Sequence, residues 1–351
     1  MTALTVIGLL LGLMALCWTA PTWAVEPEHN SEINQLRDSG ADSAAAPGTE
    51  SVQAAEPEEA PPGVWDYLFS GRLLAFLLVA AAGLLLLLTR WVNRWVRIGM
   101  MLLAFVLFGM EIVFPMHPSP MCAITKLFMF KILFGSFIAI FLAMFLAILV
   151  PSLIGRKLFC GWVCPLGALQ ELVNKVPFKF KWKQFNFNAF NAVRFMLLIM
   201  FLLTFFAVKS QILTLGTELG ADTAGGLWTM YSGYSLYDPI NYFEFLHWQI
   251  DLRLIIMMVI LVVASLFIYR PFCYGACPIG ALTWLAEKIA PGQIRVDKAK
   301  CTECGICEEE SPCPTIRPLR LANTKILPDC TSCGECIRSC PEKAISFKFK
   351  S

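Results

Sequence analysis

Residues 301–314 read CTECGICEEESPCP and residues 330–341 read CTSCGECIRSCP, and these two segments decide how the end of the chain folds. Each contains three cysteines at C-x-x-C-x-x-C spacing and a fourth directly before a proline. Three thiolates on one tight loop reach three irons of a 4Fe-4S cube, and the fourth cysteine reaches across to the other cube. Zinc also binds paired C-x-x-C, but it needs neither the third cysteine nor the trailing Cys-Pro. The spacing therefore predicts two 4Fe-4S clusters.

The crossed fourth cysteines give each predicted cluster its ligands. Cluster 1 takes Cys301, Cys304, Cys307 and Cys340, and cluster 2 takes Cys330, Cys333, Cys336 and Cys313. In the first segment five residues separate the third and fourth cysteines where three are usual, so Cys313 departs most from the pattern. We expect residues 291–351 to form an α+β domain of the two-cluster, bacterial ferredoxin-like kind.

The remainder of the chain has the composition of an integral membrane protein. Of the 351 residues, 57% are hydrophobic and 15% are charged, and several apolar runs are long enough to cross a bilayer. This composition excludes a water-soluble core. We expect an α-helical transmembrane domain at residues 64–290, with five spans at about residues 73–89, 98–114, 132–154, 195–208 and 252–269.

Two segments precede the first predicted span. Residues 1–24 hold an apolar stretch of signal-peptide length that ends in Thr22-Trp23-Ala24, and we interpret them as a signal peptide or an uncleaved N-terminal anchor. Residues 25–63 are acidic and rich in Ala, Pro and Ser, a composition that buries too little apolar surface to fold. We expect this second segment to be a disordered tether on the periplasmic side.

The basic residues predict the orientation of the spans. The connections between spans one and two and between spans three and four hold most of the Lys and Arg near the membrane, which places both connections in the cytoplasm. The residues concerned are Arg90, Arg94, Arg97, Arg156, Lys157, Lys175, Lys179, Lys181, Lys183 and Arg194. The cysteine-rich domain is then cytoplasmic, where reducing conditions keep thiols free. We expect a multi-pass protein of the bacterial inner membrane.

A second cysteine signature occurs twice, as FCGWVCPLGAL at residues 159–169 and FCYGACPIGAL at residues 272–282. The copies are offset by 113 residues and each follows a predicted helix hairpin, so we interpret the membrane domain as two parallel repeats. The prolines suit the first turn of helices at residues 166–176 and 279–289. The two C-x3-C-P sequences, named the twin motifs below, contribute Cys160, Cys164, Cys273 and Cys277.

Four thiolates at one membrane face are enough for a third iron–sulfur cluster or for one soft metal ion. A redox-active dithiol is an alternative chemistry, and small cysteines packed at a helix end are the interpretation without chemistry. The repetition of Phe-Cys, Cys-Pro and Gly-Ala-Leu in both copies favours a shared chemical role.

With these motifs the chain resembles the membrane polyferredoxins of the NapH, MauN and NosR type over residues 98–351. The resemblance implies membrane electron transfer, as a quinol dehydrogenase subunit that oxidises quinol and delivers electrons toward a periplasmic cytochrome or reductase. It also implies that the twin-motif cysteines lie at the membrane face and that the eight C-terminal cysteines bind clusters. We expect no large external flavin-binding domain of the NosR type, because the predicted tether is too short for one.

A quinone site needs a proton acceptor near the outer face. The candidates are Glu111 in the second span, His117 just beyond it and His247 before the fifth span. Snorkelling to water is the other interpretation of Glu111, and ligation of a haem is a further one for the two histidines. A soft-ligand group nearby suits either Cu(I) or membrane packing. Its members are Met110, Met116, Met121 and Cys122.

Residues 209–249 are rich in glycine and aromatic residues, and we interpret them as a docking surface for the periplasmic partner or as an interfacial anchor. Two alternatives to quinol oxidation stay open. A cytoplasmic ferredoxin-type donor loads the clusters and electrons flow outward, or the protein handles copper and serves in maturation or regulation of a metalloenzyme. The chain contains no phosphate-binding loop, dinucleotide fingerprint or nucleophile elbow, and we expect no nucleic-acid partner.

Overall fold

The architecture comes from a computed structural model that describes residues 63–109, 119–178, 180–182, 186–220, 226–227, 230–231, 237, 241–243, 252–321 and 329–349. The predicted leader and nearly all of the predicted tether lie outside these residues, as do Met110 and Met116. The quinone-site candidates Glu111, His117 and His247 also lie outside them.

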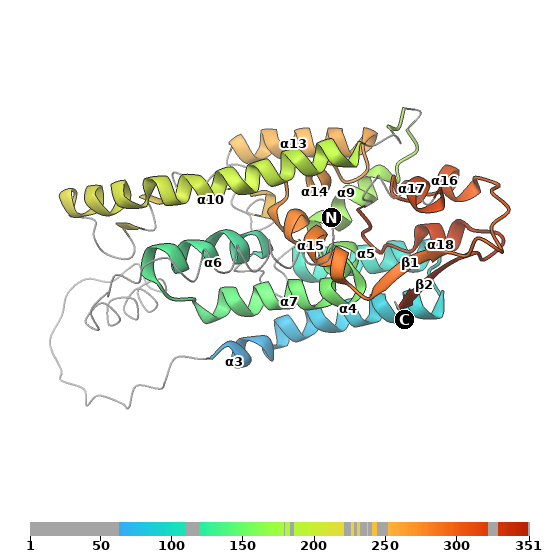
Figure 1. The fold of residues 1–351 in the computed structure, drawn as a ribbon, viewed down its shortest axis with the longest axis horizontal. Coiled ribbons are helices and arrows are strands. Elements are labelled where there is room, and N and C mark those ends of the chain that lie inside the picture. Colours follow the sequence, from blue (N-terminus) through green and yellow to red (C-terminus); the bar gives the residue numbers. More distant parts are fainter. Residues whose placement is uncertain are drawn as a thin grey trace.

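The long helices lie side by side along the long axis of the molecule, with the C-terminal module at one end (Figure 1). In the described residues α4 and α10 are long and apolar enough to cross a membrane, and α7 and α13 are shorter apolar helices. The 32 residues of α10 extend about 48 Å, which exceeds a hydrocarbon core of about 30 Å. The elements are α3 (Val64–Leu68), α4 (Gly71–Thr89), α5 (Arg94–Gly109), α6 (Pro120–Phe134), α7 (Ala139–Gly155), α10 (Phe187–Glu218) and α13 (Leu252–Phe267).

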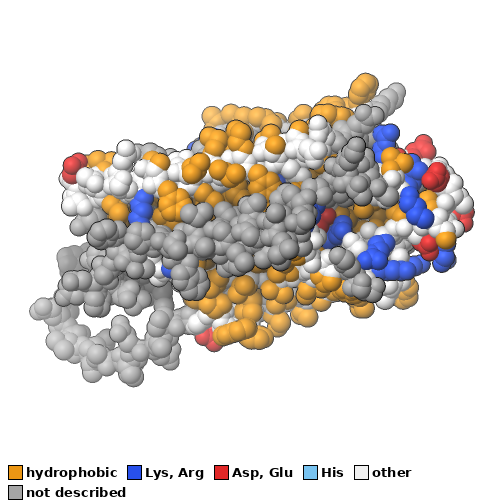
Figure 2. Space-filling model, in the orientation of Figure 1, with side chains coloured by type: hydrophobic (Ala, Val, Ile, Leu, Met, Phe, Trp, Pro, Cys, Tyr) orange, Lys and Arg blue, Asp and Glu red, His pale blue; other side chains and the backbone are white. Residues whose placement is uncertain are grey.

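Helix α4 shows how the apolar sequence divides between two environments. Leu73, Phe76 and Leu87 recur at helical spacing and are buried, and α4 packs against α7. On its other side Leu78 and Leu85 are each 61% exposed. Figure 2 shows hydrophobic side chains covering the flank of the long helices in the same way. An outer surface of this kind suits lipid better than water.

The third predicted span is interrupted by a turn. The predicted third span covers residues 132–154, but the chain breaks at Gly135, which caps α6 in the left-handed conformation at φ 71°. Helix α6 begins after Ser119, whose side chain accepts a hydrogen bond from the Cys122 backbone, and it packs against α7. Hydropathy sums apolar residues without registering a turn inside the run, which explains why the break is missed.

Each twin motif folds as a short helix, a Cys-Pro turn and a second helix. The first copy forms α8 (Leu158–Trp162) and α9 (Pro165–Asn174), and the second forms α14 (Pro271–Gly275) and α15 (Pro278–Ile289). Both prolines occupy the first turn, as the sequence predicts, because proline has no N–H to leave unpaired there. The second cysteine of each motif is therefore the N-cap residue of its second helix.

In its described residues the C-terminal module contains a small sheet and three short helices. Strands β1 (Gly292–Val296) and β2 (Ile345–Phe349) pair antiparallel, with Ile294 opposite Phe347, and so join the two ends of the module. The loops between these strands carry α16 (Ile306–Glu310), α17 (Ile316–Arg320) and α18 (Glu335–Ser339). All eight C-terminal cysteines therefore lie between two paired strands.

Candidate functional site

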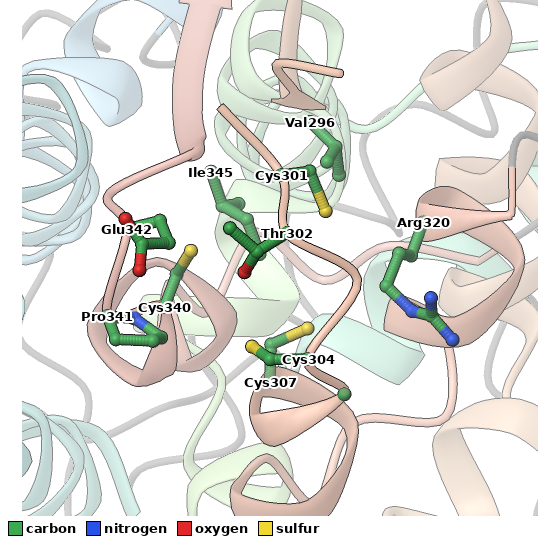
Figure 3. Close-up of a pocket in the computed structure, with 11 residues that line it drawn as sticks. Val296, Cys301, Thr302, Cys304, Cys307, Arg320, Cys340, Pro341, Glu342 and Ile345 are labelled. Atoms are coloured by element: carbon green, nitrogen blue, oxygen red, sulfur yellow. The ribbon is translucent and has the colours of Figure 1, made fainter. Parts of the chain in front are cut away.

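The four predicted ligands of cluster 1 line one pocket. Cys301, Cys304 and Cys307 come from the first cysteine segment, and Cys340 comes from the end of the second, so the pocket joins distant parts of the sequence. Figure 3 shows the four sulfurs around a common space, with Val296 and Ile345 of the two strands above it. Thiolates arranged around a space, rather than meeting at a point, suit a cube-shaped cluster.

The four predicted ligands of cluster 2 are also neighbours. The Cys313 thiol lies close enough to the thiols of Cys330, Cys333 and Cys336 to interact with them electrostatically. All four residues are buried. A hydrogen bond between Cys313 and Cys333 raises the pKa of the first and lowers the pKa of the second to about 6. Burial raises the pKa of Cys330 to about 12, so a cluster held by this residue would have to displace its proton.

The second cysteine segment is pressed against the first twin motif. The space beside Gly161 is filled by the backbone carbonyl of Thr331, so a larger side chain at residue 161 would collide with that oxygen. The Trp162 indole donates to the Ser332 carbonyl at 2.9 Å, and the Ser332 hydroxyl donates to the Gly155 carbonyl at 2.8 Å. The residues between the cysteines of the motif are therefore a docking surface.

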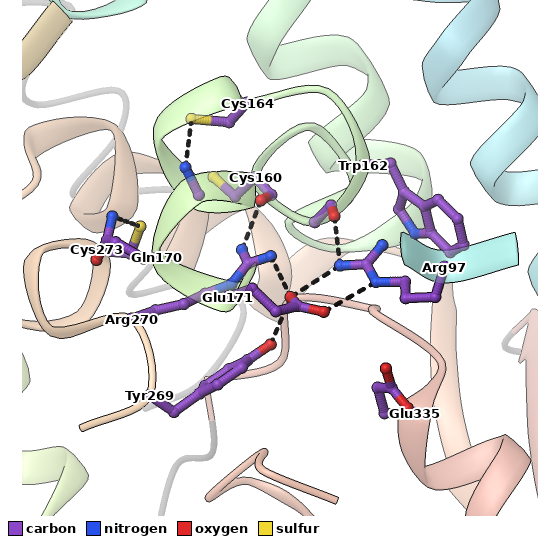
Figure 4. A network of polar contacts seen from close by, with 12 residues as sticks. Arg97, Cys160, Trp162, Cys164, Gln170, Glu171, Tyr269, Arg270, Cys273 and Glu335 are labelled. Carbon is purple, nitrogen blue, oxygen red and sulfur yellow. Dashed lines mark hydrogen bonds and ion pairs between the residues drawn. The ribbon is translucent and has the colours of Figure 1, made fainter. Parts of the chain in front are cut away.

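The twin-motif cysteines lie close together at the base of the long helices. Cys160, Cys273 and Cys277 all belong to the electrostatic environment of the Cys164 thiol. Burial raises the pKa of Cys164, and the other three thiols raise it further. The Cys273 sulfur lies 3.4 Å from the Gln170 amide nitrogen (Figure 4). In the described part of the chain, no three His, Cys, Asp or Glu side chains converge tightly enough to hold a single metal ion.

A buried arginine holds the backbone of each twin motif. Arg270 donates to the Cys160 carbonyl at 2.6 Å, and Arg194 donates to the Cys273 carbonyl at 3.2 Å. Both arginine side chains are fully buried. A Cβ at Gly167 or Gly280 would lie 2.9 or 2.5 Å from these carbonyl oxygens and 3.2 Å from the arginines. The glycine of each C-P-x-G sequence therefore makes room for the arginine contact.

Glu171 binds two buried arginines next to the first twin motif. Its carboxylate accepts from Arg97 at 3.0 and 2.9 Å, from Arg270 at 2.6 Å and from the Tyr269 hydroxyl at 2.9 Å (Figure 4). Burial by itself would raise the pKa of Glu171, but Arg97 and Arg270 outweigh burial and hold this pKa well below its usual range. The carboxylate is therefore ionised and shared by two buried guanidinium groups.

Asp329 has the matching role beside the second motif. Its carboxylate pairs with the Lys157 ammonium at 2.5 Å and with Arg194 at 2.9 Å, and all three side chains are buried. The Tyr274 hydroxyl donates to the Asp329 carbonyl at 3.2 Å. Since Asp329 directly precedes Cys330, these contacts connect a predicted cluster-2 ligand to the residue after Cys273.

Sequence reasoning missed these buried ion pairs. It counts Arg97, Arg194 and Lys157 as membrane-flanking charges, whereas the structure buries all three. The signal that could have revealed the contacts is the repeated C-P-x-G, since a glycine one turn into each helix indicates a close approach. Of the predicted soft-ligand group, Met121 and Cys122 are buried, and the Cys122 sulfur lies 3.8 Å from the Asn241 amide.

Comparison with known proteins adds independent support. A family model described as a 4Fe-4S binding domain matches residues 137–183 and again residues 250–296, and each match contains one twin motif. Ferredoxin-type protein NapH of Haemophilus influenzae is 28% identical over 215 residues, which are 58% of this chain and 66% of NapH. Regulatory protein NosR of Pseudomonas aeruginosa is 28% identical over 166 residues, which are 47% of this chain and 21% of NosR. These similarities support the resemblance of the chain to polyferredoxins of the NapH/NosR type.

A third relative of this chain is YccM of Escherichia coli, named as an electron transport protein, with 28% identity over 199 residues. These residues are 55% of this chain and 51% of YccM, so the chain spans about half the length of that relative. No solved structure matches the chain significantly. The predicted resemblance to NapH and NosR is confirmed, and iron–sulfur clusters are the cofactors named for the matching domain.

Proposed function

We propose that this protein is a quinol-linked electron-transfer polyferredoxin that passes electrons between the membrane quinone pool and a periplasmic redox partner. The observation that carries the proposal is the docking of the second cysteine segment on the first twin motif, through Gly161 and Trp162. This contact brings the second group of four cysteines beside the first twin motif, and Cys336 of the second group also lies near Cys307 of the first. We therefore propose that the three groups form a row in the order first segment, second segment and twin motifs.

The proposed row of three cysteine groups has one end exposed to solvent, at the first cysteine segment, and a buried interior. Cys304 of the first group is exposed, and Cys307 of that group lies in the electrostatic environment of Cys336 of the second. The second group is buried, and its Cys333 lies beside Arg97, whose guanidinium group also binds the first twin motif at Gly161. Clusters bound at the three groups would supply one-electron carriers. The protein's own contribution is to hold the groups in line and to exclude water from the inner two.

The buried charges support an anionic group at the twin motifs. Glu171 faces two buried arginines, and Asp329 faces Arg194 and Lys157. Glu287 is a third buried carboxylate near Lys157, so these four buried cations exceed the three buried carboxylates by one. An uncompensated buried charge is strongly disfavoured. A 4Fe-4S cluster with four thiolate ligands is negatively charged, whereas four protonated thiols are neutral. We therefore assign a third 4Fe-4S cluster to the twin motifs, with Cys160, Cys164, Cys273 and Cys277 as its ligands.

The proposed topology has five spans, formed by α4, α5, α7, α10 and α13. The twin-motif helices and the C-terminal module lie at the same end of these helices, which suits a single cytoplasmic face (Figure 1). The tether of residues 25–63 is then periplasmic, and residues 291–351 form the cytoplasmic two-cluster domain. The periplasmic partner is proposed to be a cytochrome or reductase, in keeping with relatives whose names describe electron transport and ferredoxin-type proteins.

The test is anaerobic addition of a menaquinol analogue to the purified, oxidised full-length protein, followed by electron paramagnetic resonance (EPR). Reduction of the clusters by quinol is the expected result. Clusters that stay oxidised with quinol but are reduced by a low-potential ferredoxin would instead indicate outward flow from a cytoplasmic donor.

Metal content distinguishes electron transfer from copper handling. The variant Cys160→Ser/Cys277→Ser is expected to lose about four irons per chain and to keep the two C-terminal clusters. Loss of bound copper with an unchanged iron content would indicate a copper-handling protein.

A further inference from the structure

A polar pocket lies where the membrane helices meet the C-terminal module. It is lined from three directions: the start of α5, the end of α9 with the segment after it, and the helices α16 and α18 with the residues beside them. We name it the junction pocket. Its lining residues are Arg94, Asn174, Lys175, Lys181, Glu310, Pro312, Glu335 and Arg338.

The lining of the junction pocket is predominantly positive. Four lining side chains are cationic and two are acidic, which leaves two positive charges in excess. Glu335 is shared by Lys175 at 2.5 Å and Arg338 at 3.0 Å, so this carboxylate is already engaged by two of the cations. Arg94 is exposed at the rim. The charge of the pocket is therefore complementary to an anionic ligand.

The surroundings of the pocket indicate where that ligand comes from. Trp91 and Trp95, on either side of Arg94 in the sequence, are 78% and 75% exposed, and Phe180 beside Lys181 is 82% exposed. Large aromatic side chains of this kind are typical of the level at which a bilayer meets water. On the face drawn in Figure 2, Lys and Arg side chains gather at the end that carries the C-terminal module. Basic pockets between membrane helices at the cytoplasmic side bind lipid headgroups.

We propose that the junction pocket binds the phosphate headgroup of an anionic membrane lipid, which bridges the membrane helices to the C-terminal module. The inference rests on the proposed function only for its topology, with this end of the helices at the cytoplasmic face. Arg94 and Lys181 face the headgroup from the membrane side, and Arg338 faces it from the module. The lipid thereby stabilises the docking of the second cysteine segment, because Glu335 lies directly before Cys336.

The experiment uses the full-length protein purified in detergent from native membranes. Mass spectrometry measures the phosphatidylglycerol and phosphatidylethanolamine retained per chain. The same protein is then placed in phosphatidylcholine nanodiscs with and without added phosphatidylglycerol. The variant Arg94→Gln/Lys181→Gln removes two of the pocket cations. Its matched control, Lys300→Gln/Arg317→Gln, removes two exposed cations from the C-terminal module away from the pocket lining.

Wild type and the control are expected to retain phosphatidylglycerol, and the pocket variant is expected to bind it about fivefold more weakly for each cation removed. Equal retention in all three proteins would overturn the proposal, as would equal retention of phosphatidylcholine. Displacement of the lipid by millimolar inorganic phosphate would mean that the pocket binds free phosphate. This result would overturn the lipid assignment. An acidic protein that binds wild type without lipid would also overturn it.

Iron content and cluster EPR signals of the same samples separate this proposal from the proposed function. A pocket variant that keeps its clusters but loses phosphatidylglycerol supports the lipid site, whatever the quinol experiment shows. Arg94→Lys, which keeps the charge, is expected to retain the lipid. Loss of the lipid in Arg94→Lys as well would show that the side-chain shape rather than the charge matters and would overturn the electrostatic basis of the site.

Discussion

The first and second cysteine segments share their spacing, but their surroundings differ. Gly305 and Gly334 occupy the same place in the two segments, with φ angles of 77° and 80°. A Cβ at Gly305 would meet nothing within 4 Å, whereas one at Gly334 would lie 2.9 Å from both Leu87 and Val92. The cysteine spacing thus specifies the loop that surrounds a cluster, and the other residues of the segment specify where that loop docks.

The two segments also differ in their ion pairs. In the first, Glu308 pairs with Arg320 at 2.5 Å, with side chains 24% and 16% exposed. In the second, Glu335 pairs with Lys175, and Asp329, which directly precedes the segment, pairs with Lys157. Both carboxylates are nearly fully buried. The comparison indicates that the first segment is the open end of the row and that the second is fixed to the twin motifs.

The largest loss of stability is expected when the carboxylate of Glu171, which Arg97 and Arg270 share, is removed. Glu171→Gln leaves the Arg97 and Arg270 guanidinium groups buried without their anion, and breaking a buried pair in this way costs about 3–5 kcal/mol. The free energy of unfolding in detergent should fall by that amount, and the EPR signal of cluster 2 should be lost. The matched change in the first segment, Glu308→Gln, should cost about 0–1 kcal/mol because its ion pair is partly exposed. Equal effects of the two changes would contradict the comparison.

A smaller but still large effect is expected at the contact between the segment and the motif. Gly161→Ala places a methyl group against the Thr331 carbonyl oxygen, so the second segment must move away. Overpacking of this kind typically costs about 1–3 kcal/mol. The control is Gly99→Ala in α5, where a Cβ would meet nothing within 4 Å. The first variant should unfold at a lower temperature and show a changed cluster-2 EPR signal. The control should keep that signal and lose no stability, because alanine favours a helix more than glycine does.

Comparing Gly305 with Gly334 separates the energetic contribution of docking from that of backbone strain. Gly305→Ala and Gly334→Ala both force an L side chain into the left-handed region, which costs about 1–2 kcal/mol in each case. Gly334→Ala has the additional contacts with Leu87 and Val92, so it should be more destabilising by about 1 kcal/mol or more. Denaturant titration of the two variants measures the difference. If Gly305→Ala proved the more harmful change, the assignment of the open end would be reversed.

The smallest effect is expected from one hydrogen bond. Trp162→Phe removes the indole N–H that donates to the Ser332 carbonyl but keeps an aromatic ring in place. Loss of a single buried hydrogen bond costs about 1 kcal/mol. Trp65→Phe is the control, since Trp65 is 69% exposed. Hydrogen exchange at residues 330–336 should quicken in Trp162→Phe and not in the control.

Much of the candidate site can be predicted from the sequence. The spacing of the cysteines predicts that Cys340 joins the first group and Cys313 the second, and the structure brings both residues to those groups. The Cys-Pro turns and the helices after them follow from the conformational preference of proline. These features are local, or they depend on a spacing that one type of cluster imposes.

The docking of the second segment on the twin motifs could not be predicted in this way. Arg97 and Arg194 look in the sequence like interfacial charges, and only the three-dimensional contacts with Glu171 and Asp329 show that they are buried. Hydropathy also gives no sign of the break at Gly135 that separates α6 from α7. Long-range pairing of polar residues leaves no periodic signal in a sequence.

A row of three clusters, with the cluster of the second segment in the middle, is tested most directly by pulsed EPR of the fully reduced protein. The middle cluster is expected to show magnetic coupling to two neighbours, and Cys160→Ser/Cys277→Ser should abolish one coupling and leave the other. Iron analysis of the same samples should give about twelve irons per chain in wild type and about eight in the variant. About eight irons in both proteins, with a single coupling that the substitution leaves unchanged, would contradict the third cluster and the row.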